Sequence, residues 1–536
     1  MKKLWCSILA IMLIFTLSAC TANSDAGTDK KSEDSEKVLY LNNQVEPTSF
    51  DPPIGFDSVS WSALNNLMEG LVRLDKNNEP VAAAAEKWDV SEDGKVYTFH
   101  IRDKAKWSNG DDVTAGDFVF AWKRLLNPDT ASPASFLGYF IDGAEDYANG
   151  KGSADDVKLK AVDDKTFEVT LTSPQAYFLN VISNPAFFPI NEKVAVENPE
   201  WFSEADSFVG NGPFNLTAWE HDNYFEMTKN KDYWDASTVK LDKVHWAMIN
   251  DTNTEYQMFQ NGELDTSDVP PDLSEQLFKD GKVKIEDQAG TYFYRFNVTK
   301  KPFNNKNIRK AFALAVDQQQ IVDYVTKSKE KPAYGFVSYG FKDADGNDFR
   351  EKSGDLLKTN VEEAKKLLEQ GMKEEGYDKL PEVTLTYSTS DTHKAIAEAL
   401  QQMFKDNLGV DVKLANMEAN VFVQDQTGLK LQLSRSSFLA DYGDPINFLE
   451  NFQTGLAMNR TGWSNAKYDQ LIKEAKNESD ETKRFEIMYQ AEKLLLDEAP
   501  IFPIHFYNYV YMQNDDVTGI VRHPVGYLEL KWADKK

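Results

Sequence analysis

The sequence has 536 residues, which is long enough for two or three domains with sizeable cores. Hydrophobic residues make up 41% of it, a fraction that is typical of globular proteins and excludes a disordered chain. The formal net charge of -27 argues against binding to nucleic acid and against direct adhesion to anionic lipid, because both depend on clustered Lys and Arg.

Residues 1–19 have the pattern of a signal peptide for export. Lys2 and Lys3 precede an apolar run of about 16 residues, which is shorter than the roughly 20 residues needed to span a bilayer. The run ends in Leu-Ser-Ala-Cys, with the cysteine at Cys20, and this ending resembles a bacterial lipobox. The alternative is an ordinary secretory signal followed by a chance cysteine.

The cysteine content favours a lipid anchor at Cys20. Cys6 leaves with the signal, so the mature chain retains one cysteine and has no possible intrachain disulfide. Acylation explains this unpaired cysteine and would hold the protein at the cell membrane, facing outside the cytoplasm. Residues 20–37 would then comprise the lipidated cysteine and a disordered tether, because residues 21–37 are rich in Ser, Asp and Lys and have no large apolar side chain.

From about residue 70 to 206, the sequence predicts a region that mixes helices with strands and is rich in strands. Strands are indicated by alternating apolar residues, and a helix by apolar residues at helical spacing after a capping Thr114. The predicted elements are a first strand in KVLYLNNQ (37–44), a second strand region (95–107), a helix (115–127) and a hairpin (158–174).

The last third of the chain alternates helices with short strands, which indicates an α/β domain. Gly409 is expected to end the second of four helices, just before a strand at 410–417. A strand-like alternation at 429–434 precedes the stretch RSSFLADYGDP, and an apolar turn is expected at 446–450. The four segments with helical spacing are 361–377, 393–409, 468–478 and 482–500.

Motifs of common enzymes and metal sites are absent from the sequence. It contains no G-x-S-x-G, H-E-x-x-H, P-loop or C-x-x-C motif, and its six histidines are scattered. An S-x-x-K match at 328–331 lies in a charged, loop-like run, and we interpret it as chance. Asp441 and Asp444 lie three positions apart and could be called an acid pair, but nothing nearby indicates a pocket for a sugar ring. We therefore predict no enzymatic activity, no metal and no cofactor.

Five stretches together point to one protein family. The stretches are AEKWDV to WKRL (85–125), FVGNGPFNLTAWE (208–220), NGELD (261–265), FNVTKKPFNNKNIRKAFALAVD (296–317) and ADYGDP (440–445). They keep one order and spacing in a match that runs from about Val38 to the C-terminus, and they resemble the peptide-binding lipoproteins of ABC importers. These form the oligopeptide- and dipeptide-binding type of solute-binding protein family 5, which includes members that take murein tripeptide.

The resemblance implies an α/β fold with three domains in two lobes. This is the clam of periplasmic binding proteins (class II, peptide-binding type), in which hinge crossovers let the lobes close on a ligand. It also implies a monomer that captures short peptides and delivers them to an ABC permease, and that touches the membrane through its lipid alone. The domains would be domain I (38–68, 207–292 and 509–536), domain II (69–206) and domain III (293–508).

The resemblance assigns charged residues to the two ends of a peptide. In this family the acid of the Ala-Asp-Tyr segment pairs with the ligand's α-amino group, and Asp441 has this position. Arg435 and His393 match positions that bind the ligand's carboxylate, and Arg460 is a further candidate. The alternatives are a turn carboxylate for Asp441, a surface side chain on a strand edge for Arg435, a water-facing residue in a first helical turn for His393 and a loop or helix-end role for Arg460.

Further candidates are placed only by their position in the family pattern. Aromatic residues are common pocket walls but are also typical of cores. A departure from the pattern is Ala419 after Glu418, where many relatives have Trp, and it would leave one side-chain pocket larger or wetter. The candidates are Tyr292, Phe293 and Tyr294 at the first crossover, Tyr507 at the second, Phe438, and Phe56 with Ser58 in a ligand-contact loop.

Two other functions stay open at this point. One is a binding protein for a non-peptide ligand such as a nickel chelate on the same fold, although Asp441 argues against it because a chelate brings no α-amine. The other is an exported hydrolase.

Overall fold

Residues 36–536 are described by the computed structural model of the protein, and Lys37–Lys536 form one unit. The predicted signal peptide, Cys20 and almost all of the predicted tether lie outside the described residues. The division into three domains stays a prediction. Within residues 36–536, no helix is long and apolar enough to cross a membrane.

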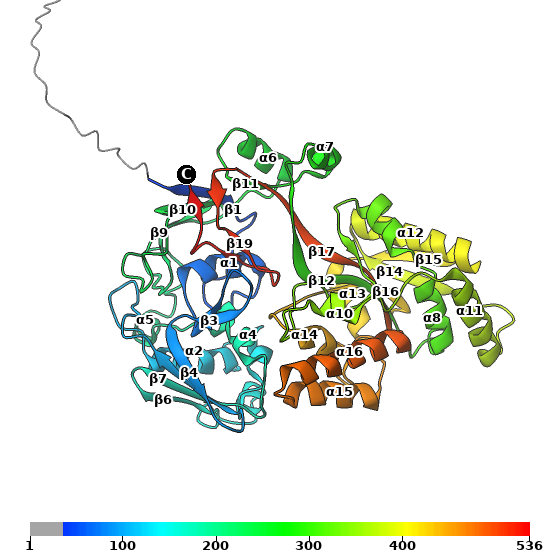
Figure 1. The fold of residues 1–536 in the computed structure, drawn as a ribbon, viewed down its shortest axis with the longest axis horizontal. Coiled ribbons are helices and arrows are strands. Elements are labelled where there is room, and N and C mark those ends of the chain that lie inside the picture. The colour runs from blue at the N-terminus through cyan, green and yellow to red at the C-terminus, as the bar shows by residue number, and fades with distance from the viewer. Residues whose placement is uncertain (1–35) are drawn as a thin grey trace, which may run out of the picture. The chain divides into compact units, whose positions relative to one another are not determined.

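The first sheet joins strands from two distant parts of the chain (Figure 1). β1 (Val38–Asn42) pairs in parallel with β10 (Lys243–Ala247), which confirms the strand predicted in KVLYLNNQ. β9 (Tyr224–Lys229) and β8 (Phe214–Glu220) continue the sheet as antiparallel neighbours. The helix α1 (Ser58–Leu67) contacts β8 and buries most of its residues.

The second sheet has the strand order β4-β5-β7-β6, all antiparallel. Its strands β5, β7 and β6 confirm the predicted second strand and the predicted hairpin. The elements of this part of the chain are β2 (Val72–Leu74), β3 (Pro80–Ala82), β4 (Ala85–Val90), β5 (Val96–Ile101), α2 (Ala115–Leu126), α3 (Ala144–Ala148), β6 (Leu159–Asp163), β7 (Thr166–Thr170), α4 (Phe178–Ile182) and α5 (Glu192–Glu197).

The helix α2 begins where the sequence predicts. Thr114 accepts from the backbone N–H of Asp117, and the Asp117 carboxylate accepts from the backbone N–H of Thr114, which completes a capping box. Phe118 and Trp122 are spaced by one turn and are fully buried, so they fix α2 against β6 and β7.

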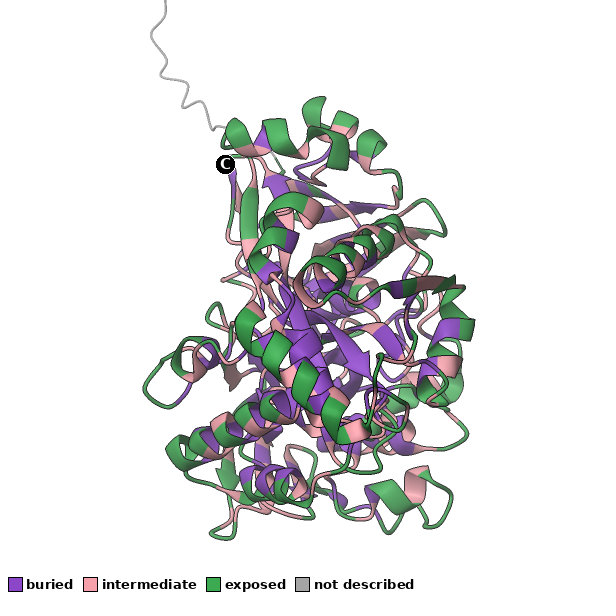
Figure 2. Cartoon of the chain, turned by 90° about the vertical axis from the view of Figure 1, so that its right-hand side faces the viewer, coloured by how far each residue is buried: buried purple, intermediate pink, exposed green. Residues whose placement is uncertain are grey.

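The third and largest sheet has seven strands in the order β11-β17-β12-β16-β14-β15, with β13 paired to β17. Buried strands occupy the interior of this part of the molecule, and helices with exposed outer faces surround them (Figure 2). The strands are β11 (Thr266–Asp268), β12 (Lys284–Phe296), β13 (Lys331–Pro332), β14 (Val383–Ser388), β15 (Val412–Met417), β16 (Leu433–Leu439) and β17 (Ile501–Gln513).

The four helices predicted for the last third are all present. Ser390 caps the start of α12 and Gly409, in the left-handed conformation, ends it. The helices of the second half of the chain are α6 (Thr252–Gln260), α7 (Ser274–Lys279), α8 (Lys306–Leu314), α9 (Gln318–Ile321), α10 (Phe349–Ser353), α11 (Val361–Glu375), α12 (Asp391–Leu408), α13 (Ala419–Thr427), α14 (Ile446–Leu449), α15 (Ala466–Asn477) and α16 (Glu481–Glu498).

Two predictions around RSSFLADYGDP are wrong in their boundaries. The strand predicted at 429–434 lies instead at Leu433–Leu439, because this stretch pairs with β12 and β14. The carbonyls of Leu429 and Leu431 accept from the Asn297 side chain and lie in a loop. The apolar turn expected at 446–450 is the short helix α14, followed by a 3₁₀ turn.

β12 and β17 are the two crossovers between the part of the fold around β11 and the α/β part (Figure 1). Each has 13 residues, and they pair antiparallel along most of their length. The register breaks between Asp287 and Thr291, where the chain bulges at 288–290. At Gly290 an added Cβ would lie 2.3 Å from the Leu439 side chain on β16 and 3.0 Å from the Tyr507 ring on β17, so the three strands pack closely at the bulge.

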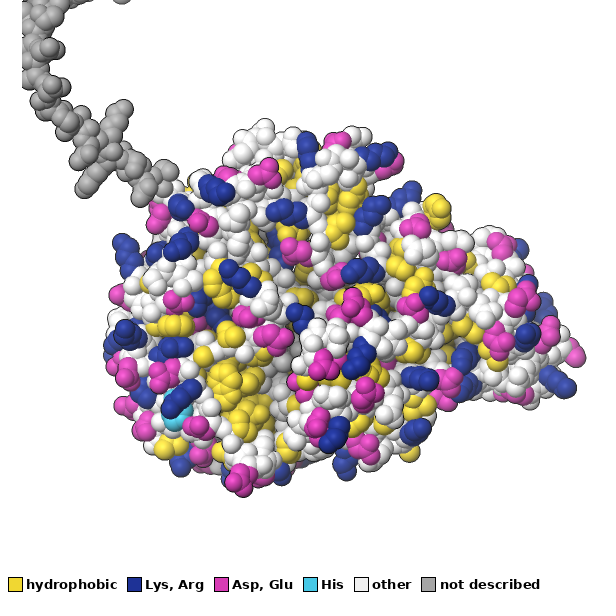
Figure 3. All heavy atoms as spheres, viewed as in Figure 1, with side chains coloured by type: hydrophobic (Ala, Val, Ile, Leu, Met, Phe, Trp, Pro, Cys, Tyr) yellow, Lys and Arg dark blue, Asp and Glu magenta, His cyan; other side chains and the backbone are white. Residues whose placement is uncertain are grey.

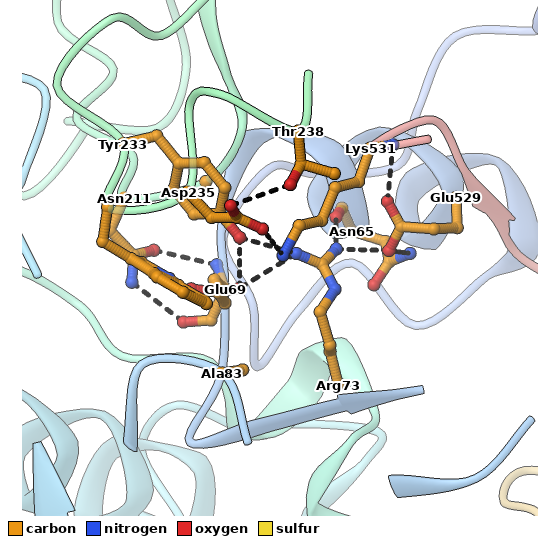
Figure 4. Close-up of polar contacts among 12 residues, drawn as sticks. Asn65, Glu69, Arg73, Ala83, Asn211, Tyr233, Asp235, Thr238, Glu529 and Lys531 are labelled. Carbon is orange, nitrogen blue, oxygen red and sulfur yellow. Dashed lines mark hydrogen bonds and ion pairs between the residues drawn. The ribbon is translucent and has the colours of Figure 1, made fainter. Parts of the chain in front are cut away.

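A buried polar network joins the segment after α1 to the first sheet and to the C-terminal segment (Figure 4). Arg73 pairs with Glu69 at 2.9 Å and also with Glu529, and it donates to the Tyr233 hydroxyl. Trp234 donates to the second oxygen of Glu69. Removing one partner of such a buried pair typically costs about 3–5 kcal/mol, so the network fixes residues 69–73 against the first sheet.

The two ends of the folded unit are neighbours. Lys37 forms an ion pair with Asp534 at 2.5 Å, and the Lys535 ammonium donates to the carbonyl of Val38 at 3.1 Å. The C-terminal segment YLELKWADKK (527–536) forms only the short strands β20 (Leu528–Glu529) and β21 (Asp534–Lys535), and β21 pairs with β18 (Val517–Thr518). β20 pairs with β19 (Val521–Arg522).

Candidate functional site

A cavity of about 550 Å³ lies between α1, β11, the end of β17 and the segment that follows β16. Asp441, from RSSFLADYGDP, and Ser58, the first residue of α1, both line it. The structure thus brings together two of the residues predicted from the sequence, although 383 positions separate them along the chain. The other lining residues that carry charge are Glu255, Asp268 and Arg522.

The backbone of Asp441 is held on both sides. Its N–H donates to the Asn447 side chain in α14 at 2.8 Å, and its carbonyl accepts from the Asn184 side chain at 3.1 Å. Burial raises the pKa of the Asp441 carboxyl to about 6; the hydrogen bond with Asn447 opposes this rise and the nearby Glu450 carboxylate adds to it. No cationic side chain among the described residues contributes to this pKa, so the carboxylate faces the cavity without a positive partner.

A second cluster forms around Arg435 on β16. Its guanidinium lies 4.9 Å from the centre of the Tyr292 ring and 3.5 Å from the Tyr507 hydroxyl, while its buried Nε has no hydrogen-bond partner. The Tyr292 hydroxyl lies 3.2 Å from Nδ1 of His393. Four predicted residues from β12, α12, β16 and β17 therefore meet at one place, but none of them lines the cavity that contains Asp441.

His393 is not a cation at neutral pH. Burial lowers its pKa to about 4, and the positive charge of Arg435 adds to this effect. A neutral imidazole can donate one hydrogen bond but cannot form an ion pair with a carboxylate. The positive charge of this cluster is therefore that of Arg435, and His393 is placed to contribute a hydrogen bond.

Arg460 lies behind the same strand. Its Nη1 donates to the Gln426 side chain at 3.4 Å, and Gln426 in turn donates to the backbone carbonyl of Arg435 at 2.8 Å. The Nε of Arg460 is buried without a hydrogen-bond partner, and burial lowers the pKa of its guanidinium. The structure thus connects Arg460 to Arg435 through one side chain.

Four other predicted residues belong to the packing of the fold. Phe438 packs edge-on against Phe448, Tyr294 is fully buried and stacks on Phe502, and Phe56 packs against Trp61. Phe293 is likewise fully buried. None of these residues lines the cavity, and their contact with a ligand stays a prediction. Ala419 begins α13, is exposed, and leaves its neighbour Val421 exposed as well.

No pattern in the sequence identifies the remaining charged residues of the cavity. Burial raises the pKa of Glu255 to about 7, and the nearby Asp268 carboxylate contributes to the rise. Arg522 stacks over the Tyr511 ring at 3.9 Å. These residues come from α6, β11 and β19, which belong to no recognisable motif and which only the folded chain brings together.

The face of the molecule shown in Figure 3 carries no large patch of one charge. Lys and Arg side chains alternate with Asp and Glu over this face.

Comparison with known proteins places these features in context. Residues 79–460 match a family described as bacterial extracellular solute-binding proteins, family 5 Middle. Over 538 aligned residues the chain is 64% identical to the dipeptide-binding protein DppE of Bacillus subtilis (strain 168), with 100% of this chain and 99% of the relative covered.

Two solved structures extend this comparison. Listeria monocytogenes OppA bound to peptide is 33% identical, has a TM-score of 0.75, and is matched over 94% of this chain and 100% of that chain. The unliganded open form of MppA, a periplasmic murein tripeptide-binding protein, is 30% identical with a TM-score of 0.80 and is matched over 94% of this chain and 98% of that chain.

Proposed function

The chain belongs to the bacterial extracellular solute-binding proteins of family 5, and on this premise we propose that it captures short peptides outside the cytoplasm and delivers them to an ABC permease. The α/β periplasmic-binding-protein fold expected from the sequence is confirmed by the match to solved structures of this type. The relatives are binding proteins of transport systems, which confirms the prediction that the chain is not an enzyme.

The observation that carries the proposal is the partly buried carboxylate of Asp441 at the cavity. A peptide brings a fixed α-ammonium, and a charge that leaves water needs a partner of opposite sign. Asp441 offers such a partner, because no cation among residues 36–536 perturbs its carboxyl. Its raised pKa of about 6 also means that an incoming positive charge stabilises the ionised form.

Arg435 is the candidate for the other end of the peptide. Six residues of extended chain separate it from Asp441, a distance of about 20 Å, whereas an extended tripeptide is about 10 Å long. The long Arg435 side chain and the Asp441 carboxylate would cover much of the difference, which favours short peptides over long ones. The Nε of Arg435 has no hydrogen-bond partner, so the guanidinium can bind a carboxylate through two hydrogen bonds.

Murein tripeptides are a finer version of the same proposal. They carry more than one carboxylate, and Arg435 and Arg460 are connected through Gln426 in one region. The similarity to MppA supports the idea, although the likeness to DppE supports dipeptides equally. His393 adds a hydrogen-bonding group and no charge, because of its low pKa.

The test removes the charge of Asp441 and the charge of the ligand separately. In Asp441→Asn the ligand's ammonium stays buried and unpaired, which typically costs about 3–5 kcal/mol. Peptide binding should therefore weaken by roughly a hundredfold to a few thousandfold, while the thermal unfolding temperature stays near that of the native protein. Calorimetry with a free-amine peptide gives the two affinities.

An N-acetylated peptide is the matched control. It lacks the cation, so it should bind the native protein poorly and lose little more affinity in Asp441→Asn. A variant that binds the free-amine peptide as tightly as the native protein does would show that Asp441 is only a turn residue. Native mass spectrometry of the same mixtures separates the alternatives, because a hydrolase would release cleaved products and a chelate-binding protein would leave the peptide unbound.

The proposed location is the outer side of the cell membrane, with a lipid on Cys20 as the only anchor. The proposal rests on the Leu-Ser-Ala-Cys ending of the signal sequence and on the absence of any other cysteine from the mature chain. Cys20→Ser should remove the acylation site without unfolding the protein. The native protein should enter the detergent phase on phase partitioning and the variant should not; a variant that still partitions into detergent would refute the lipobox.

A further inference from the structure

A part of the chain that does not line the cavity reaches the backbone of Asp441. Among the described residues that line the cavity, none lies in 69–206. Asn184 belongs to this segment, yet its side-chain amide donates to the carbonyl of Asp441 at 3.1 Å. Asn184 is 1% exposed, so the hydrogen bond is made away from bulk water, where it is worth more than at the surface.

The local structure accounts for the oxygen of the Asn184 side chain but not for its amide nitrogen. Its Oδ1 accepts from the N–H of Ala186 at 2.9 Å and caps a 3₁₀ turn at 185–187. Serine or aspartate would cap this turn equally well, since a cap needs only an acceptor oxygen. The amide nitrogen is the part that a cap does not require, and it is the part that reaches Asp441.

The neighbouring contacts hold the same stretch against segment 69–206. The rings of Tyr177 and Tyr442 are stacked, with centroids 5.5 Å apart and an interplanar angle of 6°. The guanidinium of Arg484 lies 5.3 Å from the centre of the Tyr177 ring and forms a buried ion pair with Asp444. Residues 441–444 are therefore packed against segment 69–206 at more than one point.

We infer that Asn184 is a positioning residue that fixes Asp441 for the ammonium of the ligand. The inference rests on the proposed function, in which Asp441 pairs with that ammonium. Asn447 holds the N–H of Asp441 from its own side of the hinge and Asn184 holds its carbonyl from segment 69–206, so both backbone groups are fixed when the two sides are together. A carboxylate held in this way in the closed complex needs no further ordering by the ligand. Segment 69–206 thereby contributes to affinity without touching the ligand.

The test is Asn184→Ser, measured by calorimetry with trialanine and N-acetyl-trialanine. Serine keeps an oxygen for the cap but is too short to reach the Asp441 carbonyl. Loss of one buried hydrogen bond that orders the carboxylate should weaken trialanine binding about three- to tenfold. Binding of N-acetyl-trialanine, which does not use the carboxylate, should change by less than about twofold. A purely structural role for Asn184 would weaken both peptides equally.

Asn191→Ser is the matched control. Asn191 also lies in segment 69–206, is 5% exposed and caps a helix, α5, by accepting from the N–H of Val194 at 3.0 Å. It has no contact with Asp441, so its serine variant should bind both peptides as the native protein does. If thermal unfolding shows that Asn184→Ser does not fold, Asn184→Asp replaces it, because aspartate keeps the size and the capping oxygen and lacks the amide donor.

The outcomes separate this inference from the function on which it rests. A selective loss for trialanine supports the positioning role. An equal loss of affinity for both peptides, or no loss for either, overturns the positioning role. The proposed function is unaffected in that case, provided that the native protein still discriminates between the two peptides. A native protein that binds neither peptide, or both equally, overturns the proposed pairing at Asp441 and this inference with it.

Discussion

At the scale of single residues, burial decides the chemistry of the candidate site. Asp441 and His393 are both buried enough to disfavour their charged forms, but the consequences differ. Asp441 becomes a carboxylate that gains from a cation, whereas His393 becomes a neutral donor. A list of charges from the sequence treats His393 as a potential cation, and only its burial beside Arg435 removes that charge.

The raised pKa of Asp441 predicts that peptide affinity depends on pH. Only the carboxylate pairs with an ammonium, and with a pKa of about 6 its ionised fraction falls roughly tenfold between pH 7 and pH 5. The affinity for a free-amine peptide should therefore fall about tenfold over this range, as measured by calorimetry. Asp441→Asn should show no such change, and a native protein whose affinity is the same at both pH values would contradict the pairing.

The same pKa has the opposite effect on the empty protein. The folded state binds this proton more tightly than the unfolded chain does, because the pKa is raised above its usual value of 3.8. Ionisation of Asp441 therefore costs stability as the pH rises from about 4 to about 6, and a bound ammonium offsets the cost. A bound peptide should accordingly raise the thermal unfolding temperature more at pH 7 than at pH 5.

The sequence pointed to Asp441 and Arg435 as candidates but not to the rest of the candidate site. Both lie in one recognisable stretch, so their position in the family pattern identifies them. Arg522 and Asn184 lie in segments without a motif, and they approach the site only through pairing and packing between distant parts of the chain. Aromatic residues such as Tyr294 were candidates by position, but the side chain points into the core, which alternation along β12 alone does not decide.

At the scale of elements, the bulge at 288–290 interrupts the ladder between β12 and β17. Gly290→Ala should destabilise the protein by about 1–3 kcal/mol, since its Cβ would press on the Tyr507 ring and on Leu439. Denaturant unfolding measures the loss.

Gly116→Ala is the control for the same chemical change. Gly116 lies in α2, where an added Cβ would only reach ordinary contact distance from Thr114, and alanine favours the helix. It should leave stability unchanged or raise it by up to about 1 kcal/mol. If Gly290→Ala behaves in the same way as Gly116→Ala, the crossovers are not tightly apposed at the bulge.

Elements with local signals were predictable, and the exceptions have tertiary causes. α2 and α12 carry caps at Thr114 and Ser390, and their spacing of apolar residues is regular. β16 was displaced by about four residues, because alternation in 429–434 is as good as in the true strand and only pairing with β12 and β14 selects Leu433–Leu439.

At the scale of the whole molecule, the buried network around Arg73 and the crossovers have different roles. The network ties residues 69–73 to the first sheet, whereas the chain passes to the α/β part through β12 and β17. Motion is therefore expected at the crossovers and not at the network. This is the arrangement that a hinge closing on a ligand requires.

Closure should be visible when peptide is added to the native protein. Small-angle scattering should show a smaller radius of gyration, and hydrogen exchange should slow around Tyr292 and Tyr507. Asp441→Asn at the same peptide concentration should show neither change, because it stays largely unliganded. Unchanged scattering and exchange in the native protein at saturating peptide would count against a fold that closes.

The adjacency of the two chain ends suggests a use for the protein as a tool. Lys37 and Asp534 touch, so a linker of a few residues would join the C-terminus to the start of β1 without disturbing the first sheet. The chain could then be cut elsewhere, for example in the exposed turn at Gly346, to give a circular permutant. One fluorescent protein at a new end and a second in the linker beside β1 would report the distance between the two sides of the hinge, and a permutant of this kind would turn ligand capture into an optical signal.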